Sequence, residues 1–295
     1  MRVFITGATG FIGIPVVREL IAGGHEVLGM TRSEAVAQSL LAAGADVHRG
    51  SLEDLGSLKS GAAASDAVIH LAFVDDYSKF QENCEIDKHA IEALGSELAG
   101  SDRPLIVASG TAGLAAPGQV ATEDHEVPPN FPLPRVSEQT ARSLKGVNAS
   151  VMRLPQVHDT IKQGLVTYLI AVAREKGLSA YVGEGRNRWA AAHVSDVARL
   201  YRLALEKHEA GAKYHAVAEE GVPMRDIAEA VGRGLKLPAV SLSPEKAAAH
   251  FGWLAMFAGA DLVASSEKTR KNLGWNPKGP GLIADLQGMD YSQVA

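Results

Sequence analysis

The sequence of 295 residues contains a single cysteine, Cys84, and this scarcity excludes two kinds of site. One cysteine can form neither an internal disulfide nor a cysteine-based zinc cluster. The ten histidines include no His-x-x-x-His pair and no His-Glu-x-x-His motif, the spacings that place two zinc ligands on one helix face. We therefore expect no metal site.

Strong charge bias and long apolar runs are also missing. The formal net charge of −5 gives no electrostatic reason to expect nucleic acid or an anionic membrane as a partner. The apolar run at 164–173 is about half the ~20 residues that a membrane span requires. The first residues lack the pattern of an export signal, so we expect a protein of the reducing cytoplasm.

Short β-branched segments alternate with longer helical patterns through the first half of the chain. The predicted strands cover residues 2–6, 25–31, 45–50, 66–72, 104–109 and 149–154. The clearest predicted helices cover residues 11–23, 33–43 and 85–99. This alternation predicts βαβ units with right-handed crossovers, and hence an α/β fold whose parallel sheet has helices on both faces.

After residue 155 the pattern changes to helices separated by loops that contain glycine and proline. These helices are predicted at 164–177, 194–207, 223–235 and 265–274. We expect residues 1–155 to form the sheet domain, and residues 156–295 to form mainly a smaller substrate lobe. Segments near 189–217 are expected to return to the sheet domain.

A glycine-rich turn separates the first predicted strand from the first predicted helix. Its candidate binding residues are Gly7, Thr9, Gly10, Phe11, Ile12 and Gly13. Glycine allows a tight turn and lets backbone amides approach a pyrophosphate, which the N-terminus of the following helix also attracts. An ordinary glycine-rich turn is the alternative. The strand–turn–helix context favours a dinucleotide site in a doubly wound Rossmann sheet.

An ordered set of motifs resembles the short-chain dehydrogenase/reductase superfamily, in its extended and atypical branch of NAD-dependent epimerases and dehydratases. The motifs are TGATGFIG at 6–13, RGSLEDL at 49–55, VIHLA at 68–72, IVASGTAG at 106–113, RLPQVH at 153–158 and RWAAAHVSDVA at 188–198. They span nearly the whole chain. The resemblance implies a Rossmann fold and an NAD(P)-dependent oxidoreductase or epimerase-like enzyme.

The resemblance also assigns cofactor contacts beyond the glycine turn. It places Ser51 and Leu52 beside the adenine, His70, Leu71 and Ala72 along the cofactor channel, and Pro155 and Gln156 beside the nicotinamide. The family usually has an aspartate where Ser51 stands, which predicts a weaker hydrogen bond to the adenine. For His70 a buried core histidine is the alternative, because isolated histidines seldom mark sites.

The end of the second predicted strand discriminates between the two nicotinamide cofactors. NAD-preferring folds carry an acidic residue there that binds the ribose 2′-hydroxyl. This chain has Thr31, Arg32 and Ser33 instead, with no acid before Glu34. A guanidinium is well suited to a 2′-phosphate, so we expect NADP(H), with NAD(H) as the alternative. A solvated loop charge is the alternative role for Arg32.

The superfamily's usual catalytic pair, Tyr-x-x-x-Lys on one helix, is missing from this sequence. None of the six tyrosines is followed by a lysine four residues later. The helix expected to carry the pair spans 134–144, and the best alignment puts Pro134 and Glu138 at the two positions. Such a lysine would hold the nicotinamide ribose and lower the tyrosine pKa.

Three other polar residues are candidates for the chemistry. Ser109 and Thr111 follow a predicted strand where the family places a hydroxyl that binds the substrate oxygen. Their alternative is an ordinary turn. His158 matches the loop beside the nicotinamide, and its imidazole could replace the missing proton donor. A histidine hydrogen-bonded at the lobe interface is the alternative there.

Two functions remain open at this stage. The first is an enzyme that acts on a small carbonyl or alcohol substrate in a cleft between the sheet and the lobe. The second is a non-catalytic NADP(H)-binding redox sensor, which the missing pair favours. The enzyme is the preferred interpretation, because a lobe of suitable size to enclose a substrate is retained. The sequence leaves a homo-oligomer open.

Overall fold

The computed structural model describes residues 1–74, 79–116, 118–128 and 135–293. Its largest sheet has seven parallel strands in the order β10-β6-β5-β4-β1-β2-β3. The strands are β1 (Arg2–Thr6), β2 (Glu26–Thr31), β3 (Asp46–Arg49), β4 (Ala67–His70), β5 (Ser101–Gly110), β6 (Val147–Leu154) and β10 (Lys213–His215). The strand order reverses between β1 and β4. This topology confirms the predicted doubly wound Rossmann sheet.

Helices cover both faces of this sheet because successive strand residues point to opposite sides. In β1, Val3 and Ile5 pack with α1 (Gly13–Ala22), α2 (Glu34–Ala42) and α7 (Val194–Glu206). Phe4 points the other way and packs with α3 (Leu55–Ala63) and α4 (Phe80–Leu98), beside which lies α5 (Ser137–Ser143). Phe4 is fully buried, and burying such a side chain contributes about 1.5–3 kcal/mol.

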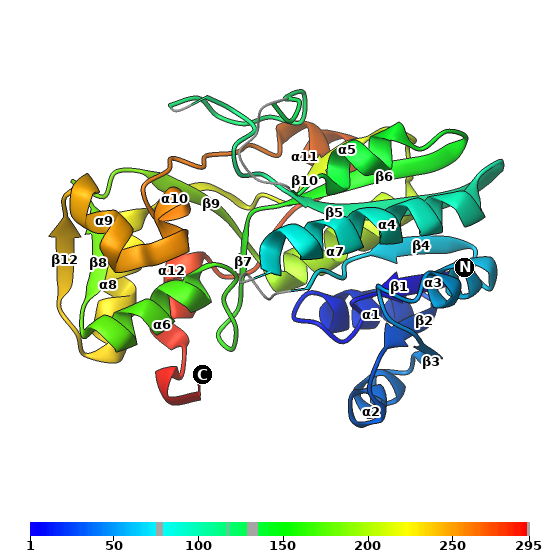
Figure 1. The fold of residues 1–295 in the computed structure, drawn as a ribbon, viewed down its shortest axis with the longest axis horizontal. Coiled ribbons are helices and arrows are strands. Elements are labelled where there is room, and N and C mark those ends of the chain that lie inside the picture. Colours follow the sequence, from blue (N-terminus) through cyan, green and yellow to red (C-terminus); the bar gives the residue numbers. More distant parts are fainter. Residues whose placement is uncertain (75–78, 117, 129–134, 294–295) are drawn as a thin grey trace.

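The second half of the chain forms a lobe beside the sheet (Figure 1). Its strands are β7 (Gln156–His158), β9 (Arg188–His193) and β11 (Glu219–Pro223) in one sheet, and β8 (Ser179–Val182) with β12 (Ala239–Leu242) in another. Its helices are α6 (Val166–Lys176), α8 (Met224–Leu235), α9 (Pro244–Phe251), η2 (Gly252–Leu254), α10 (Ala255–Ala258), α12 (Leu282–Gly288) and η3 (Tyr291–Gln293). Apart from β7, whose Val157 joins the core beneath β1, these elements share an apolar core of their own.

Several segments beyond residue 155 belong to the large sheet rather than to the lobe. Strand β10 extends the sheet beside β6, and α7 packs against α1. Leu273, the last residue of α11 (Glu267–Leu273), and the nearby Trp275 join the same apolar core as β1. Strand β9 instead pairs with β7 and β11. No helix in the described part of the chain is long and apolar enough to cross a membrane.

Candidate functional site

The glycines of the opening turn meet different surroundings. Gly7 has φ +70°, and a Cβ there would lie 2.7 Å from the Ala72 nitrogen. A Cβ at Gly13 would overlap the Gly7 carbonyl oxygen. Gly10 is exposed, and a Cβ there would meet only that same oxygen, at 3.2 Å. Gly7 and Gly13 are thus required by packing, whereas Gly10 is exposed on a side that an approaching ligand can use.

The N-terminus of α1 offers backbone donors on this exposed side. The Gly10 amide donates to the Gly7 carbonyl at 2.9 Å, which closes the turn. The amides of Phe11 and Ile12 have no acceptor among the described residues. No side chain caps α1, and its first turn contains no acidic residue. Uncapped amides and the positive end of a helix dipole together suit an anion such as a pyrophosphate.

The ends of β2 and β3 place the residues predicted to surround the adenine half. In the parallel pairing of β2 with β3, Thr31 lies beside Arg49, and Thr31 is buried. Arg32 is exposed and has no ion-pair or hydrogen-bond partner among the described residues, whereas Arg49 pairs with Glu34. Arg32 is therefore available to an external anion, as the 2′-phosphate prediction requires.

The remaining residues predicted for the adenine half are already engaged within the chain. The Ser51 hydroxyl accepts a hydrogen bond from the Asp54 amide at 3.2 Å. Leu52 lies in the apolar core beneath β3, and the Ser33 amide donates to the Thr31 hydroxyl at 3.4 Å. Any adenine contact from Leu52 is therefore apolar, and the Ser33 backbone is fixed beside β2.

His70 at the end of β4 is committed to a buried hydrogen-bonded chain. The Thr6 hydroxyl donates to its Nδ1 at 2.8 Å, and its Nε2 donates to Asp87 on α4 at 3.1 Å. The Ser137 hydroxyl donates to the other Asp87 oxygen, and Thr6 also accepts the Ala72 amide. The imidazole has both nitrogens satisfied, which favours the alternative of a core histidine.

The electrostatics of this chain explain why Asp87 can remain charged in the interior. Burial alone would raise the pKa of Asp87, but the hydrogen bonds from His70 and Ser137 and the charge of Arg135 hold the pKa below its ordinary value. The chain fixes β4 and α5 relative to one another. The backbone at Leu71 and Ala72 lies directly against Gly7, so the predicted cofactor channel and the glycine turn are adjacent.

The residues predicted near the nicotinamide lie at the ends of β5 and β6. Ser109 is partly buried, and its hydroxyl has no partner among the described residues. Thr111 is buried, and its amide donates to the Leu154 carbonyl at 3.1 Å. Gln156 follows Pro155 and is buried, with Oε1 unpartnered in the part of the chain described. These groups lie at the carboxyl edge, where ligands bind in such sheets.

His158 is the last residue of β7, and its side chain is completely buried. Its Nδ1 donates to Asp285 of α12 at 2.7 Å, and its Nε2 lies 3.8 Å from Glu219. Burial lowers the pKa of His158 although Asp285 and Glu219 oppose the shift, so the imidazole is neutral. The complete burial of this imidazole and its bond to Asp285 favour the interface alternative over the predicted proton donor.

Helix α5 carries an anion where the resemblance puts the lysine. Both Glu138 oxygens accept hydrogen bonds from Arg153, at 2.6 and 2.8 Å, and both side chains are buried. Arg153 also donates to His215 at 3.1 Å. Glu138 is therefore consumed by a structural ion pair and offers no charge to a cofactor. Pro134, at the tyrosine position, lies outside the described residues.

Arg135, which lies just before α5, matches none of the sequence motifs but reaches the site in the structure. Its guanidinium lies 4.3 Å from the centre of the Phe73 ring, just beyond β4. Its Nε donates to the Ser137 hydroxyl at 2.9 Å, and its Nη2 to the Ala108 carbonyl at 3.4 Å. The sequence feature that could have indicated it is a positively charged residue just before the helix that lacks the expected lysine. Only the fold brings it to the ends of β4 and β5.

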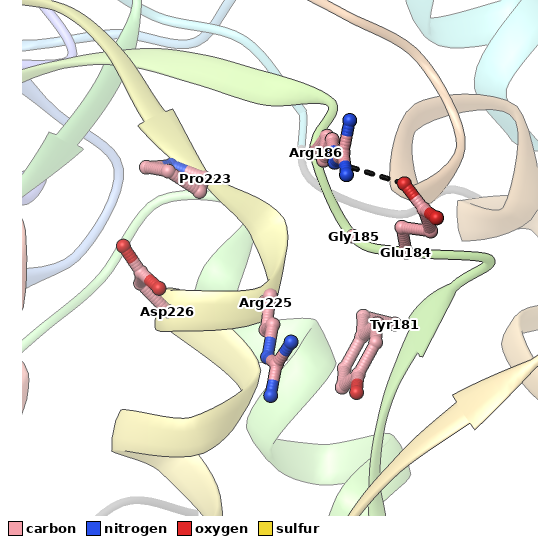
Figure 2. A pocket seen from close by; sticks show the side chains of 7 residues that line it. All are labelled: Tyr181, Glu184, Gly185, Arg186, Pro223, Arg225 and Asp226. Atoms are coloured by element: carbon pink, nitrogen blue, oxygen red, sulfur yellow. Dashed lines mark ion pairs between the residues drawn. The ribbon is translucent and has the colours of Figure 1, made fainter.

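A separate cavity of about 390 Å³ lies within the lobe, lined by Tyr181, Glu184, Gly185, Arg186, Pro223, Arg225 and Asp226. Figure 2 shows Arg225 beside the Tyr181 ring and Arg186 facing Glu184. Arg225 also pairs with Glu229, so both arginines are neutralised within the chain. None of the lining residues belongs to the predicted cofactor set.

Comparisons with known proteins agree with this geometry. The chain is 48% identical over 295 residues to an uncharacterised protein of Schizosaccharomyces pombe, covering 99% of this chain and 100% of the relative. It is 26% identical over 331 residues to the 4-hydroxy-2-methyl-3-oxo-4-farnesyl-3,4-dihydroquinoline-1-oxide ketoreductase of Stigmatella aurantiaca, covering 100% of this chain and 96% of the relative.

The fold is similar to that of the Thermus thermophilus UDP-glucose 4-epimerase in complex with NAD. The TM-score is 0.74 at 19% identity, over 100% of this chain and 99% of the other. The sequence pattern of the NAD dependent epimerase/dehydratase family matches residues 3–218. The chain therefore belongs to the NAD-dependent epimerase/dehydratase family.

Proposed function

We propose that the protein is an NAD(P)-dependent oxidoreductase or epimerase-like enzyme that acts on a small carbonyl or alcohol substrate. The observation that carries the proposal is the opening turn, where Gly10 is exposed and the uncapped N-terminus of α1 presents amides that have no acceptor among the described residues. Family membership and the Stigmatella aurantiaca ketoreductase support an enzyme of this kind. A cytoplasmic location and a homo-oligomer stay predictions.

We propose NADP(H) as the preferred dinucleotide. Its support is Arg32, an exposed arginine at the end of β2 without an ion-pair partner among the described residues. A 2′-phosphate would give this guanidinium a charge-assisted, bidentate partner. NAD(H) is the alternative, since the similar Thermus thermophilus epimerase was solved with NAD.

The dinucleotide, when bound, would supply or accept a hydride at the carbonyl carbon. The turn at residues 7–13 would hold its pyrophosphate, and the ends of β4 and β5 would flank its nicotinamide half. Ser109 and Thr111 would orient the substrate oxygen by hydrogen bonding. Because His158 is buried, solvent water is the proton donor we favour over it.

A redox sensor that binds NADP(H) without turnover is the second candidate. The observation that favours it is the buried Glu138–Arg153 pair, which replaces the expected cation on α5 with a neutralised structural contact. A sensor of this kind would bind the cofactor without catalysing a reaction. The cofactor turn would be retained, while the usual acid–base machinery would be lost.

Purified protein mixed with NADPH or NADH and a panel of aldehydes, ketones and quinones distinguishes the two functions. Loss of the reduced cofactor's absorbance with one substrate class is the result expected for the enzyme. Tight binding of NADPH with no turnover across the panel supports the sensor. Absence of any dinucleotide binding in a fluorescence titration overturns both.

A further inference from the structure

Arg135 lies in the half of the sheet that receives the nicotinamide end of a dinucleotide in doubly wound folds. The strand order reverses between β1 and β4, so the two halves of such a ligand lie on opposite sides of that point. The adenine half then lies over β1 to β3. Arg135 contacts Ala108 in β5 and Phe73 just after β4, on the other side.

Among the described residues, no carboxylate forms an ion pair with Arg135. In the same part of the chain, its Nη1 has no hydrogen-bond partner. Its charge acts on Asp87, but Asp87 already accepts hydrogen bonds from His70 and Ser137. The side chain is half-buried, so its field is screened less than that of a surface arginine.

Other cations near this edge are excluded by their contacts. Arg153 is completely buried and donates to both Glu138 oxygens, so it cannot face a ligand. Arg142, at the other end of α5, is exposed and pairs with Glu126. Among the described residues, Arg135 thus combines partial burial, a donor nitrogen without a partner and a position beside the strand ends.

We propose that Arg135 supplies the positive charge at the nicotinamide end of the site that a lysine on α5 would otherwise supply. This inference rests on the proposed function, because it requires a nicotinamide ring at the ends of β4 and β5. A guanidinium stays protonated at all relevant pH values, so Arg135 donates hydrogen bonds and stabilises negative charge on the substrate oxygen, but gives up no proton.

A fixed cation at this position discriminates between the two redox forms of the cofactor. The oxidised nicotinamide ring carries a positive charge that the reduced ring lacks. Repulsion from Arg135 therefore weakens binding of NADP⁺ relative to NADPH. At the effective dielectric of about 20 that applies near a protein surface, two like charges roughly 12 Å apart change a binding ratio by about tenfold.

The ratio of the NADP⁺ and NADPH dissociation constants tests this proposal without any knowledge of the substrate. Arg135→Gln should shift the ratio by roughly tenfold in favour of NADP⁺. Arg135→Lys keeps the charge and should leave the ratio close to that of the parent. Arg142→Gln is the matched control, since it removes an exposed arginine from the far end of α5 and should not change the ratio.

Calorimetric titrations with both cofactor forms, together with thermal unfolding of each variant, provide the readout. Arg135→Met, which keeps the aliphatic stem over Phe73, is measured if Arg135→Gln does not fold. A parental ratio in the folded uncharged variant overturns the proposal, as does a shift in Arg135→Lys equal to that of the uncharged variant. A parent that binds neither form overturns the proposed function itself, and the Arg135 assignment with it.

Discussion

At the residue scale, the opening turn contains glycines that are needed for two different reasons. We predict that Gly10→Val abolishes NADPH binding and leaves the unfolding temperature nearly unchanged, because the added side chain enters space the ligand needs. Fluorescence titration and thermal unfolding measure the two effects. Gly13→Val is the contrasting variant. It should lower stability by about 3 kcal/mol or more, since its Cβ overlaps backbone. Unchanged NADPH affinity in Gly10→Val would place the ligand elsewhere.

Arg32 allows a second prediction at this scale. Arg32→Ala should weaken NADPH binding by about 1.5–3 kcal/mol and leave NADH binding nearly unchanged, because NADH lacks the 2′-phosphate. Isothermal titration with each cofactor provides the comparison. Arg18→Ala, a change to an arginine on α1 away from the strand ends, controls for the loss of a positive charge. Equal losses for the two cofactors would remove the case for NADP(H).

The sequence predicts local features of the site well and distant partners poorly. The glycine turn is readable because its spacing, strand and helix lie within a few residues of one another. For His158 the sequence leaves both a proton donor and an interface histidine open, because its partner Asp285 lies 127 residues away and no local pattern links them. The same holds for Arg135, whose contact with Phe73 depends on how β4 and β5 are aligned.

At the scale of single elements, β10 depends on a neutral histidine. His215 donates through Nδ1 to the Ser265 carbonyl at 2.8 Å and accepts from Arg153 through Nε2. A proton on Nε2 would face the Arg153 charge. Burial, reinforced by Arg153, lowers the pKa of His215 from its ordinary 6.5 to about 3.

This pKa shift predicts an acid-dependent loss of stability. Between about pH 6.5 and pH 3 the unfolded chain binds a proton at His215 that the folded chain does not. The free energy of unfolding therefore falls as pH falls through this window, by about 1.4 kcal/mol per pH unit from this group, and is unaffected above it. In urea titrations, His215→Gln should have a lower free energy of unfolding than the parent at neutral pH. As the pH falls, this free energy should decrease less in the variant than in the parent. The exposed His89→Gln should retain the parental slope.

Helices and strands with a strong sequence pattern are easier to predict than those with a weak one. Strand β1 matches its predicted range, and Gly177, with φ +71°, ends α6 where the sequence indicated. Helix α3 was not predicted, because LGSLKSGAA contains two glycines and a weak apolar stripe. Asp54 compensates by accepting the Ser57 amide at 3.1 Å as an N-cap. The short strands β8 and β12 form by pairing with each other, so neither can be predicted from its own segment alone.

At the scale of the whole molecule, carboxylates that accept hydrogen bonds fix the lobe to the sheet. Asp196 at the start of α7 accepts the Gly279 amide at 2.7 Å, and Glu219 accepts the Leu282 amide at 2.7 Å. Asp285 on α12 accepts from His158. These contacts hold the segment before α12, and α12 itself, against the junction between the two halves.

We predict that His158→Phe destabilises the protein by about 3 kcal/mol, because it leaves the Asp285 carboxylate buried without its donor. Thermal unfolding measures the change. The double variant His158→Phe, Asp285→Leu should recover part of the loss, since both polar groups are then removed. A single variant of parental stability that has lost turnover would instead identify His158 as the proton donor.

The return of late segments to the large sheet has a consequence for how the chain is synthesised. Tyr201, Tyr214 and Trp275 all contribute to the apolar core beneath β1. A ribosome-bound chain that ends at residue 155 therefore lacks much of one face of its own first domain. Only after Trp275 has left the exit tunnel can that face close. The N-terminal half must consequently complete its fold together with the segments up to Trp275, and it cannot be exchanged as an independent module.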